Sequence, residues 1–149
     1  TKDCLLAEVS SRGYIELQDI LSRAASDKKL SAKNRFLEMA LAYIKFGLDK
    51  RNTYDLMHNH TPDKNEFPDL LKNATGAFDV LVRSVIELNP GLTEKEIGRK
   101  CIKHWAMMHG LVGLFRNSNL GKTPTEGAGR AMASVRDDLK AFLDESLNS

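Results

Sequence analysis

Histidine and cysteine are the side chains in this 149-residue sequence that first suggest chemistry, because both can bind metal ions or transfer protons. His58 and His60 are two residues apart, and His104 and His109 are five apart. Neither spacing places two imidazoles on one face of a helix, where residues three or four apart are neighbours. The histidine spacing therefore predicts no metal site, and we expect His109 to be a polar group in a pocket or in the core.

The two cysteines, Cys4 and Cys101, lie too far apart in the sequence to form a metal-binding pair. We expect both to be reduced thiols, since small secreted domains more often carry closely spaced sets of cysteines. The sequence has no Gly-rich phosphate-binding loop and no Gly-x-Ser-x-Gly turn. We therefore predict no catalytic residue, no metal ligand and no cofactor.

Aromatic and methionine side chains recur along the chain and could surround a ligand. Such side chains can line an apolar pocket in which a few polar tips orient the bound molecule. The same residues would also suit an ordinary hydrophobic core, and the sequence leaves both interpretations open. On the first interpretation, the predicted ligand-binding residues are Tyr14, Tyr43, Phe46, Met57, Phe78, Trp105, Met108 and His109.

Helices are the elements that must position these side chains. Apolar residues recur at spacings of three and four, which predicts amphipathic helices and no β-strand. The segment from Phe36 to Leu48 is apolar nearly all round, so we expect it to be the central helix. Ser31 suits a helix N-cap, and Thr93 with Glu96 forms a capping-box pattern. We expect an all-α fold of about six helices, at about residues 2–25, 31–50, 53–60, 68–88, 93–117 and 125–147.

Small residues in the fifth expected helix, and an apolar stripe on the last one, predict a dimer. Each glycine inside a helix costs roughly 1 kcal/mol relative to alanine, so two of them suggest a close approach by another helix. A helix that simply bends there is the alternative. We predict a two-fold homodimer in which both helices form a four-helix bundle, although packing within one chain would also bury them. The predicted interface residues are Ala106, Gly110, Gly113, Met132, Val135, Leu139 and Phe142.

Length, composition and charge restrict the class of protein. We expect one domain over residues 1–149, a length that can bury a sizeable core without disulfides or metal. The net charge of +2 is too small for a stand-alone nucleic-acid-binding domain. No uncharged segment approaches bilayer length and no signal peptide is visible. We therefore expect a cytoplasmic protein with no membrane contact.

Three short stretches resemble a known family when they are taken in order. Residues 105–110 read Trp-Ala-Met-Met-His-Gly, which resembles the Trp-x-x-x-His-Gly core of TetR-family regulators of the "WHG" class. Residues 42–47, Ala-Tyr-Ile-Lys-Phe-Gly, are similar to the aromatic helix of that class, and residues 54–57, Tyr-Asp-Leu-Met, to its next short helix. The start, residues 2–6, resembles the stretch that follows the recognition helix in full-length members.

The resemblance implies a function that composition and periodicity do not. It implies the ligand-binding and dimerisation domain of a transcriptional regulator, expected to be a repressor, whose effector is a small, mainly apolar molecule. Operator DNA would be bound only through an N-terminal helix-turn-helix domain, which we expect to be absent from this chain. Two other functions fit the same residues: a helical carrier or enzyme for an apolar ligand, and a dimerisation module without a ligand.

Overall fold

The computed structural model describes residues 1–59, 61–117 and 127–148. These residues form seven α-helices and one 3₁₀-helix, without a strand. None of the described helices is both long and apolar enough to cross a membrane. The helices are α1 (Lys2–Ala24), α2 (Ala32–Asp49), α3 (Arg51–Asn59), α4 (Pro68–Leu88), α5 (Glu94–Arg116), α6 (Gly127–Asp137) and α7 (Leu139–Ser146), with the 3₁₀-helix η1 (Lys64–Glu66) before α4.

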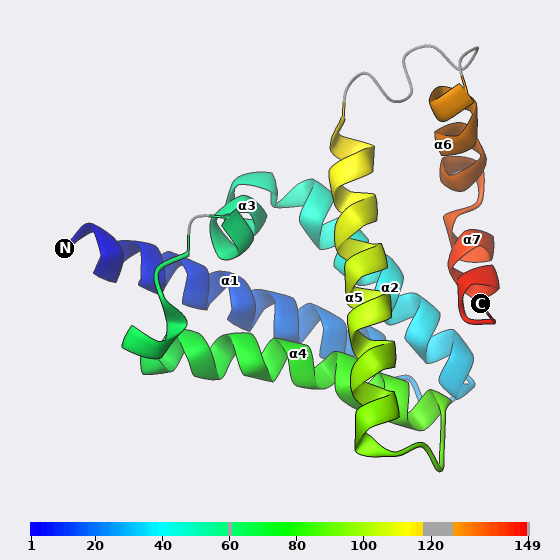
Figure 1. Ribbon diagram of the computed structural model, residues 1–149, viewed down its shortest axis with the longest axis horizontal. Coiled ribbons are helices and arrows are strands. Elements are labelled where there is room, and N and C mark those ends of the chain that lie inside the picture. The colour runs from blue at the N-terminus through cyan, green and yellow to red at the C-terminus, as the bar shows by residue number, and fades with distance from the viewer. Residues whose placement is uncertain (60, 118–126, 149) are drawn as a thin grey trace.

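The helices pack around α2, as the sequence predicted. α1 and α4 lie side by side, and α5 stands across them in front of α2 (Figure 1). α3 lies over the middle of α1, and α7 contacts α2 on the other side of α5 (Figure 1). α2 buries eight of its residues, including Phe36, Met39 and Tyr43, because helices surround it on most sides. This arrangement gives the domain one continuous hydrophobic core.

Helix starts follow the capping residues found in the sequence. Ser31 Oγ accepts a hydrogen bond from the backbone N–H of Asn34 at 3.1 Å. Thr93 Oγ1 accepts from the Glu96 N–H at 3.3 Å, and Glu96 Oε2 accepts from the Thr93 N–H at 2.9 Å. These three N–H groups would otherwise lack a partner, because the first four N–H groups of a helix have none within it. The caps therefore fix where α2 and α5 begin.

The prediction of one long C-terminal helix is wrong in its second half. The helix is divided at Asp138, whose backbone leaves the helical region (φ −146°, ψ 77°). Asp138 Oδ1 accepts a hydrogen bond from the Ala141 N–H at 2.9 Å, so this aspartate caps a new helix. The predicted start at Thr125 and the predicted end of the short helix at His60 both lie outside the described residues.

Candidate ligand-binding cavity

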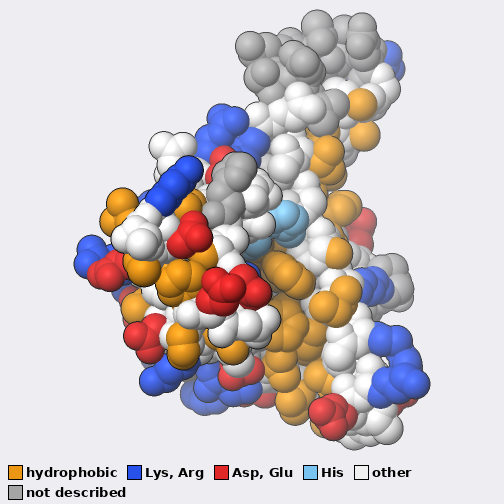
Figure 2. All heavy atoms as spheres, turned by 60° about the vertical axis from the view of Figure 1, so that its left-hand side comes forward, with side chains coloured by type: hydrophobic (Ala, Val, Ile, Leu, Met, Phe, Trp, Pro, Cys, Tyr) orange, Lys and Arg blue, Asp and Glu red, His pale blue; other side chains and the backbone are white. Residues whose placement is uncertain are grey.

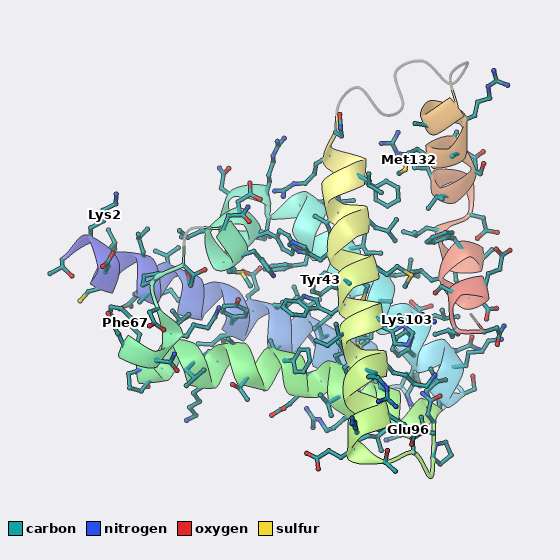
Figure 3. The ribbon with its side chains drawn as sticks, viewed as in Figure 1. Lys2, Tyr43, Phe67, Glu96, Lys103 and Met132 are labelled. Atoms are coloured by element: carbon teal, nitrogen blue, oxygen red, sulfur yellow. The ribbon has the colours of Figure 1, made fainter. Side chains whose placement is uncertain are left out.

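A cavity of about 340 Å³ lies between α1, α2, α4 and α5, with α3 and η1 at its edge. Most of its wall is apolar or aromatic. Tyr43 from α2 points into the space framed by α1, α4 and α5 (Figure 3). Three lining residues are exposed to solvent, Leu71 at 42%, Trp105 at 38% and Thr75, so the cavity has a mouth at α4 and α5. The lining residues are Tyr14, Leu17, Leu21, Met39, Tyr43, His58, Lys64, Leu71, Ala74, Thr75, Ala77, Phe78, Leu81, Trp105 and Met108.

Several of the side chains selected from the sequence meet at this cavity. Tyr14, Tyr43, Phe78, Trp105 and Met108 come from four different helices and all line it. The Phe78 and Trp105 rings pack edge to face, with centroids 5.9 Å apart. These five residues therefore share one space.

The structure places the other selected side chains elsewhere. Phe46 and Met57 are 3% and 0% exposed and belong to the packed core rather than to the cavity wall. Met57 fills the contact between α3 and α1, where its Sδ would lie 2.6 Å from a Cβ added to Gly13. His109 lies on the exposed side of α5 and contacts Tyr54 instead of the cavity.

Sequence reasoning missed two basic residues of the cavity, His58 and Lys64. Lys64 belongs to η1, which lies between the helices expected at residues 53–60 and 68–88. Its Nζ lies 5.8 Å from the centroid of the Tyr14 ring. Periodicity cannot place a side chain from an irregular segment, so no sequence signal could have found Lys64.

A chain of hydrogen bonds leads from the cavity to the outer side of α5. The Trp105 indole N–H donates to the Tyr43 hydroxyl at 3.2 Å. The Tyr43 and Tyr54 hydroxyls are 2.9 Å apart, and the Tyr54 hydroxyl is 2.5 Å from His109 Nδ1. Because the indole can only donate, Tyr43 can pass its own proton on to Tyr54. Cavity and outer face are thus connected by Trp105, Tyr43, Tyr54 and His109.

The tyrosines near this cavity stay neutral at physiological pH. Burial raises the pKa of Tyr14 to about 12, and the nearby Tyr43 adds to the effect. Burial also raises the pKa of Tyr43 and of Tyr54 above the usual value. The Tyr14 hydroxyl donates to the Met57 carbonyl oxygen at 3.0 Å, which ties α1 to α3. Neutral hydroxyls can donate and accept, so they can orient a polar group without adding charge.

His58 is held in one tautomer when it is neutral. Its Nδ1 lies 2.8 Å from the Tyr54 carbonyl oxygen, which can only accept, so Nδ1 carries the hydrogen. Burial lowers the pKa of His58 further than its hydrogen bond to the Tyr54 carbonyl raises it, and the nearby His109 and Lys64 lower it as well. The second ring nitrogen, Nε2, then has a free lone pair for a group in the cavity.

Arg116 fastens the end of α5 to α3. Its Nη1 lies 2.6 Å from Asp55 Oδ1, and its Nη2 donates to the Arg51 carbonyl oxygen at 2.8 Å. The guanidinium also lies 5.6 Å from the Tyr54 ring centroid. Arg116 therefore contacts three residues of α3, Arg51, Tyr54 and Asp55, and holds this helix against the end of α5.

The small residues of α5 face outward. Ala106, Gly110 and Gly113 are exposed, and the same side of the helix exposes Ile102 at 54% and Leu114 at 44%. A Cβ added to either glycine would meet no atom within 4 Å in the described chain. The close approach predicted for these glycines therefore has no partner within the described part of one chain.

The predicted interface residues of α6 and α7 pack largely against the chain itself. Met132 is 7% exposed, and Val135, Leu139 and Phe142 are partly buried against the core. Lys140 of α7 forms an ion pair with Glu38 of α2 at 2.9 Å. Part of the last two helices is thus already covered within one chain.

Figure 2 shows hydrophobic side chains gathered into a band down the middle of the displayed face, with histidine beside its upper part.

The described residues include no group of three or more histidine, cysteine, aspartate or glutamate side chains that could hold a metal ion. Cys101 is buried, Cys4 is exposed, and both are free thiols. The cavity wall itself is mainly apolar and carries a few hydroxyl and nitrogen groups that can form hydrogen bonds.

Comparison with known proteins agrees with the fold and the motifs. A solved structure, described as a protein with unknown function from Rhodococcus sp. RHA1, superposes with a TM-score of 0.69 at 23% identity, over 93% of this chain and 72% of that one. No curated protein matches the chain. The model of the family described as "Tetracyclin repressor-like, C-terminal domain" matches residues 36–139, which include the Trp105–Gly110 motif. The chain belongs to this family of tetracycline-repressor-like C-terminal domains.

Proposed function

We propose that this domain senses a small, mainly apolar effector and dimerises within a TetR-type transcriptional regulator of the cytoplasm. Operator binding, expected to be repressive, would be carried by a helix-turn-helix domain N-terminal to residues 1–149. The cavity is the observation that carries the proposal, because a regulator of this kind needs a site for its effector. Its volume of about 340 Å³ falls within the range of small-molecule sites.

The chemistry of the wall supports an apolar or aromatic ligand. Phe78, Trp105 and Met108 supply broad apolar contact area, and Tyr43 supplies a neutral hydroxyl. Polarizable sulfur and aromatic faces adapt to ligands of different shape. A molecule enclosed here would be held mainly by burial of apolar surface and oriented by one or two hydrogen bonds.

The outward face of α5 supports the dimer. The exposed large apolar residues of α5 are Ile102, Trp105 and Leu114. Gly110 and Gly113, which have no side chain, are exposed between Trp105 and Leu114. A two-fold contact pairs one patch with its own copy, so a single apolar face per chain is enough. The exposed remainder of Val135, Leu139 and Phe142 would complete the four-helix bundle. Obligate contacts of this kind bury roughly 2,000 Å² or more in total.

Trp105 connects the two roles. It lines the cavity, is 38% exposed, and hydrogen-bonds to Tyr43. A ligand that pushes Trp105 would therefore act on the α5 face and, through Tyr54, on His109. The two DNA-binding domains of a dimer must lie one helical turn of DNA apart to bind a palindromic operator. An effector that favours one dimer geometry therefore shifts the fraction of dimers that can bind the operator.

Titration with a neutral apolar dye, N-phenyl-1-naphthylamine, tests the cavity. Trp105 is the only tryptophan, so its emission should fall as the dye binds beside it and accepts its excitation energy. We expect saturation at one dye per chain. Ala74→Phe, which fills the cavity, should abolish the signal, and Ala141→Phe on exposed α7 should not. Non-saturating binding, or equal binding by the Ala74→Phe variant, would reject the effector site.

A further inference from the structure

The charges at the cavity have one sign. Of its lining residues, Lys64 and His58 are basic and none is acidic. Both basic groups lie at the same end, because both approach the ring of Tyr14. Lys64 Nζ is 5.8 Å from that ring's centroid, and the His58 ring centroid is 6.4 Å from it. Leu17, Leu21 and Leu81 line the cavity without any polar group.

We propose that the cavity takes an apolar molecule with an anionic headgroup, a carboxylate in the simplest case, and that Lys64 and His58 hold this headgroup. The inference rests on the proposed function and names the class of its ligand. Its apolar part would lie against Phe78, Trp105 and Met108. A charged end held by two basic side chains and an apolar end in an aromatic enclosure would give such a molecule one orientation.

Lys64 has no counter-charge of its own in the described part of the chain. Other lysines of the domain do: Lys33 pairs with Asp144 at 3.0 Å and Lys45 with Asp49 at 2.6 Å. The ammonium of Lys64 instead lies over the face of Tyr14, at the edge of an apolar space. A partly desolvated cation gains most from an anion that arrives in the same space. A carboxylate supplies this charge, and an alcohol of equal length does not.

His58 is arranged to respond to the same anion. Its Nδ1–H is already used by the Tyr54 carbonyl oxygen, so only Nε2 can reach a ligand, and it donates to one only when it is protonated. An anion beside His58 favours that protonated form, so binding takes up a proton. Anion affinity should therefore rise as the pH falls from 8 to 6. The titratable and charged groups around His58 are Tyr14 of α1, Tyr54 and Asp55 of α3, Lys64 of η1 and His109 of α5.

Isothermal titration of the domain with two matched pairs of probes tests the inference. The pairs are decanoate with decanol, and 2-naphthoate with 2-naphthol, each measured at pH 8 and pH 6. For the pair that binds, we expect the carboxylate to bind roughly tenfold more tightly than its neutral partner, as a charge-assisted hydrogen bond would give. Lowering the pH should tighten the carboxylate and leave the neutral partner unchanged.

Two lysine variants provide the matched control. Lys64→Met removes the charge at the cavity and should remove most of the preference for the carboxylate over its neutral partner. Lys72→Met removes the same charge from an exposed position of α4 outside the cavity and should leave this preference unchanged. His58→Gln should abolish the pH dependence, because an amide does not titrate.

The outcomes separate the inference from the proposed function. Equal or tighter binding of the neutral partner would overturn the headgroup assignment and leave the effector cavity standing. A carboxylate preference that survives in Lys64→Met would also overturn it. If no probe of either pair binds, the proposed function itself fails, and the inference fails with it.

Discussion

The Tyr54 hydroxyl lies 2.5 Å from His109 Nδ1, so a fully buried residue of α3 is bonded to an exposed residue of α5. The same hydroxyl lies 2.9 Å from that of Tyr43, a cavity residue. Tyr54 therefore stands at the junction between the cavity wall and the outer face of α5. Its ring also stacks on that of His109, with centroids 5.5 Å apart.

Replacing Tyr54 by phenylalanine tests this junction. The change keeps the ring but removes the acceptor of the buried Tyr43 O–H, whose oxygen still accepts from Trp105. An unpaired buried donor costs about 1–3 kcal/mol. We expect Tyr54→Phe to lower the free energy of unfolding by that amount in urea denaturation. A loss below about 0.5 kcal/mol, the range of ordinary surface substitutions, would show that these hydrogen bonds are not formed in solution.

Gly47 lies at a close contact between α2 and α5. A Cβ there would lie 2.7 Å from Cγ2 of Val112, which is 0% exposed and has no room to move. Gly47→Ala should therefore cost about 1–3 kcal/mol through overpacking. Gly98→Ala, on α5 with no atom within 4 Å, should instead gain up to about 1 kcal/mol from helix propensity. Urea denaturation of both variants checks the pair, and effects of the same sign would contradict the packing.

His104 should make the domain sensitive to acid. Burial, with the nearby charges of Lys103 and Lys100, lowers its pKa to about 4, below the ordinary value near 6.5. Between these two pH values the unfolded chain binds a proton that the folded chain does not, so stability falls as the pH drops through this window. His104→Leu removes this contribution and the buried, unbonded Nδ1.

The measurement compares unfolding free energies at pH 7 and pH 4.5. We expect the unmodified domain to lose about 2–3 kcal/mol more than His104→Leu over this interval. Carboxylates and His58 titrate in both proteins, so the difference between the two reports His104. Equal losses would mean that His104 takes up its proton as readily in the folded state as in the unfolded one.

Gly110 tests the proposed dimer face without disturbing the single chain. A Cβ added there meets no atom within 4 Å in the described chain, so we expect Gly110→Leu to be accommodated in the single protomer. In a two-fold contact the same leucine would overpack the seam, at a cost of about 1–3 kcal/mol or more. Light scattering at micromolar concentration should give a dimer for the unmodified domain and a shift towards monomer for the variant.

Gly98→Leu is the matched control for the dimer test. Gly98 also lies on α5 with open space around its Cβ position, but it is near the start of the helix, beside Lys95 and Arg99 and about three turns from Gly110. It should remain dimeric. A monomeric mass for the unmodified domain at the same concentration would contradict the proposed dimer.

Local signals predicted most of the fold. The Thr93–Glu96 capping box and Ser31 fixed helix starts, because capping bonds form between residues close in sequence. The apolar stretch around Phe36 correctly predicted the central helix, because a helix without a polar face must be surrounded by protein. The break at Asp138 was missed, since its apolar flanks continue the helical spacing on both sides.

The candidate site was less predictable than the fold, because it depends on which helices meet. Phe46 and Phe78 are the same residue type and both lie among apolar residues of a helix, yet Phe46 is core and Phe78 lines the cavity. Lys64 reaches the cavity from an irregular segment, where no periodicity applies. The close contact of Gly47 with Val112 likewise depends on the crossing of α2 and α5, which sequence spacing does not specify.

Hydrogen exchange measured by mass spectrometry, with and without saturating N-phenyl-1-naphthylamine, tests most directly whether an effector binds between α4 and α5. The account predicts slower amide exchange in peptides covering residues 70–82 and 101–112, which contain Phe78, Trp105 and Met108. The peptide covering residues 139–148 contains α7 and does not line the cavity, so its amides should exchange at an unchanged rate. Unchanged exchange in α4 and α5 at saturating dye, or protection confined to other helices, would contradict the account.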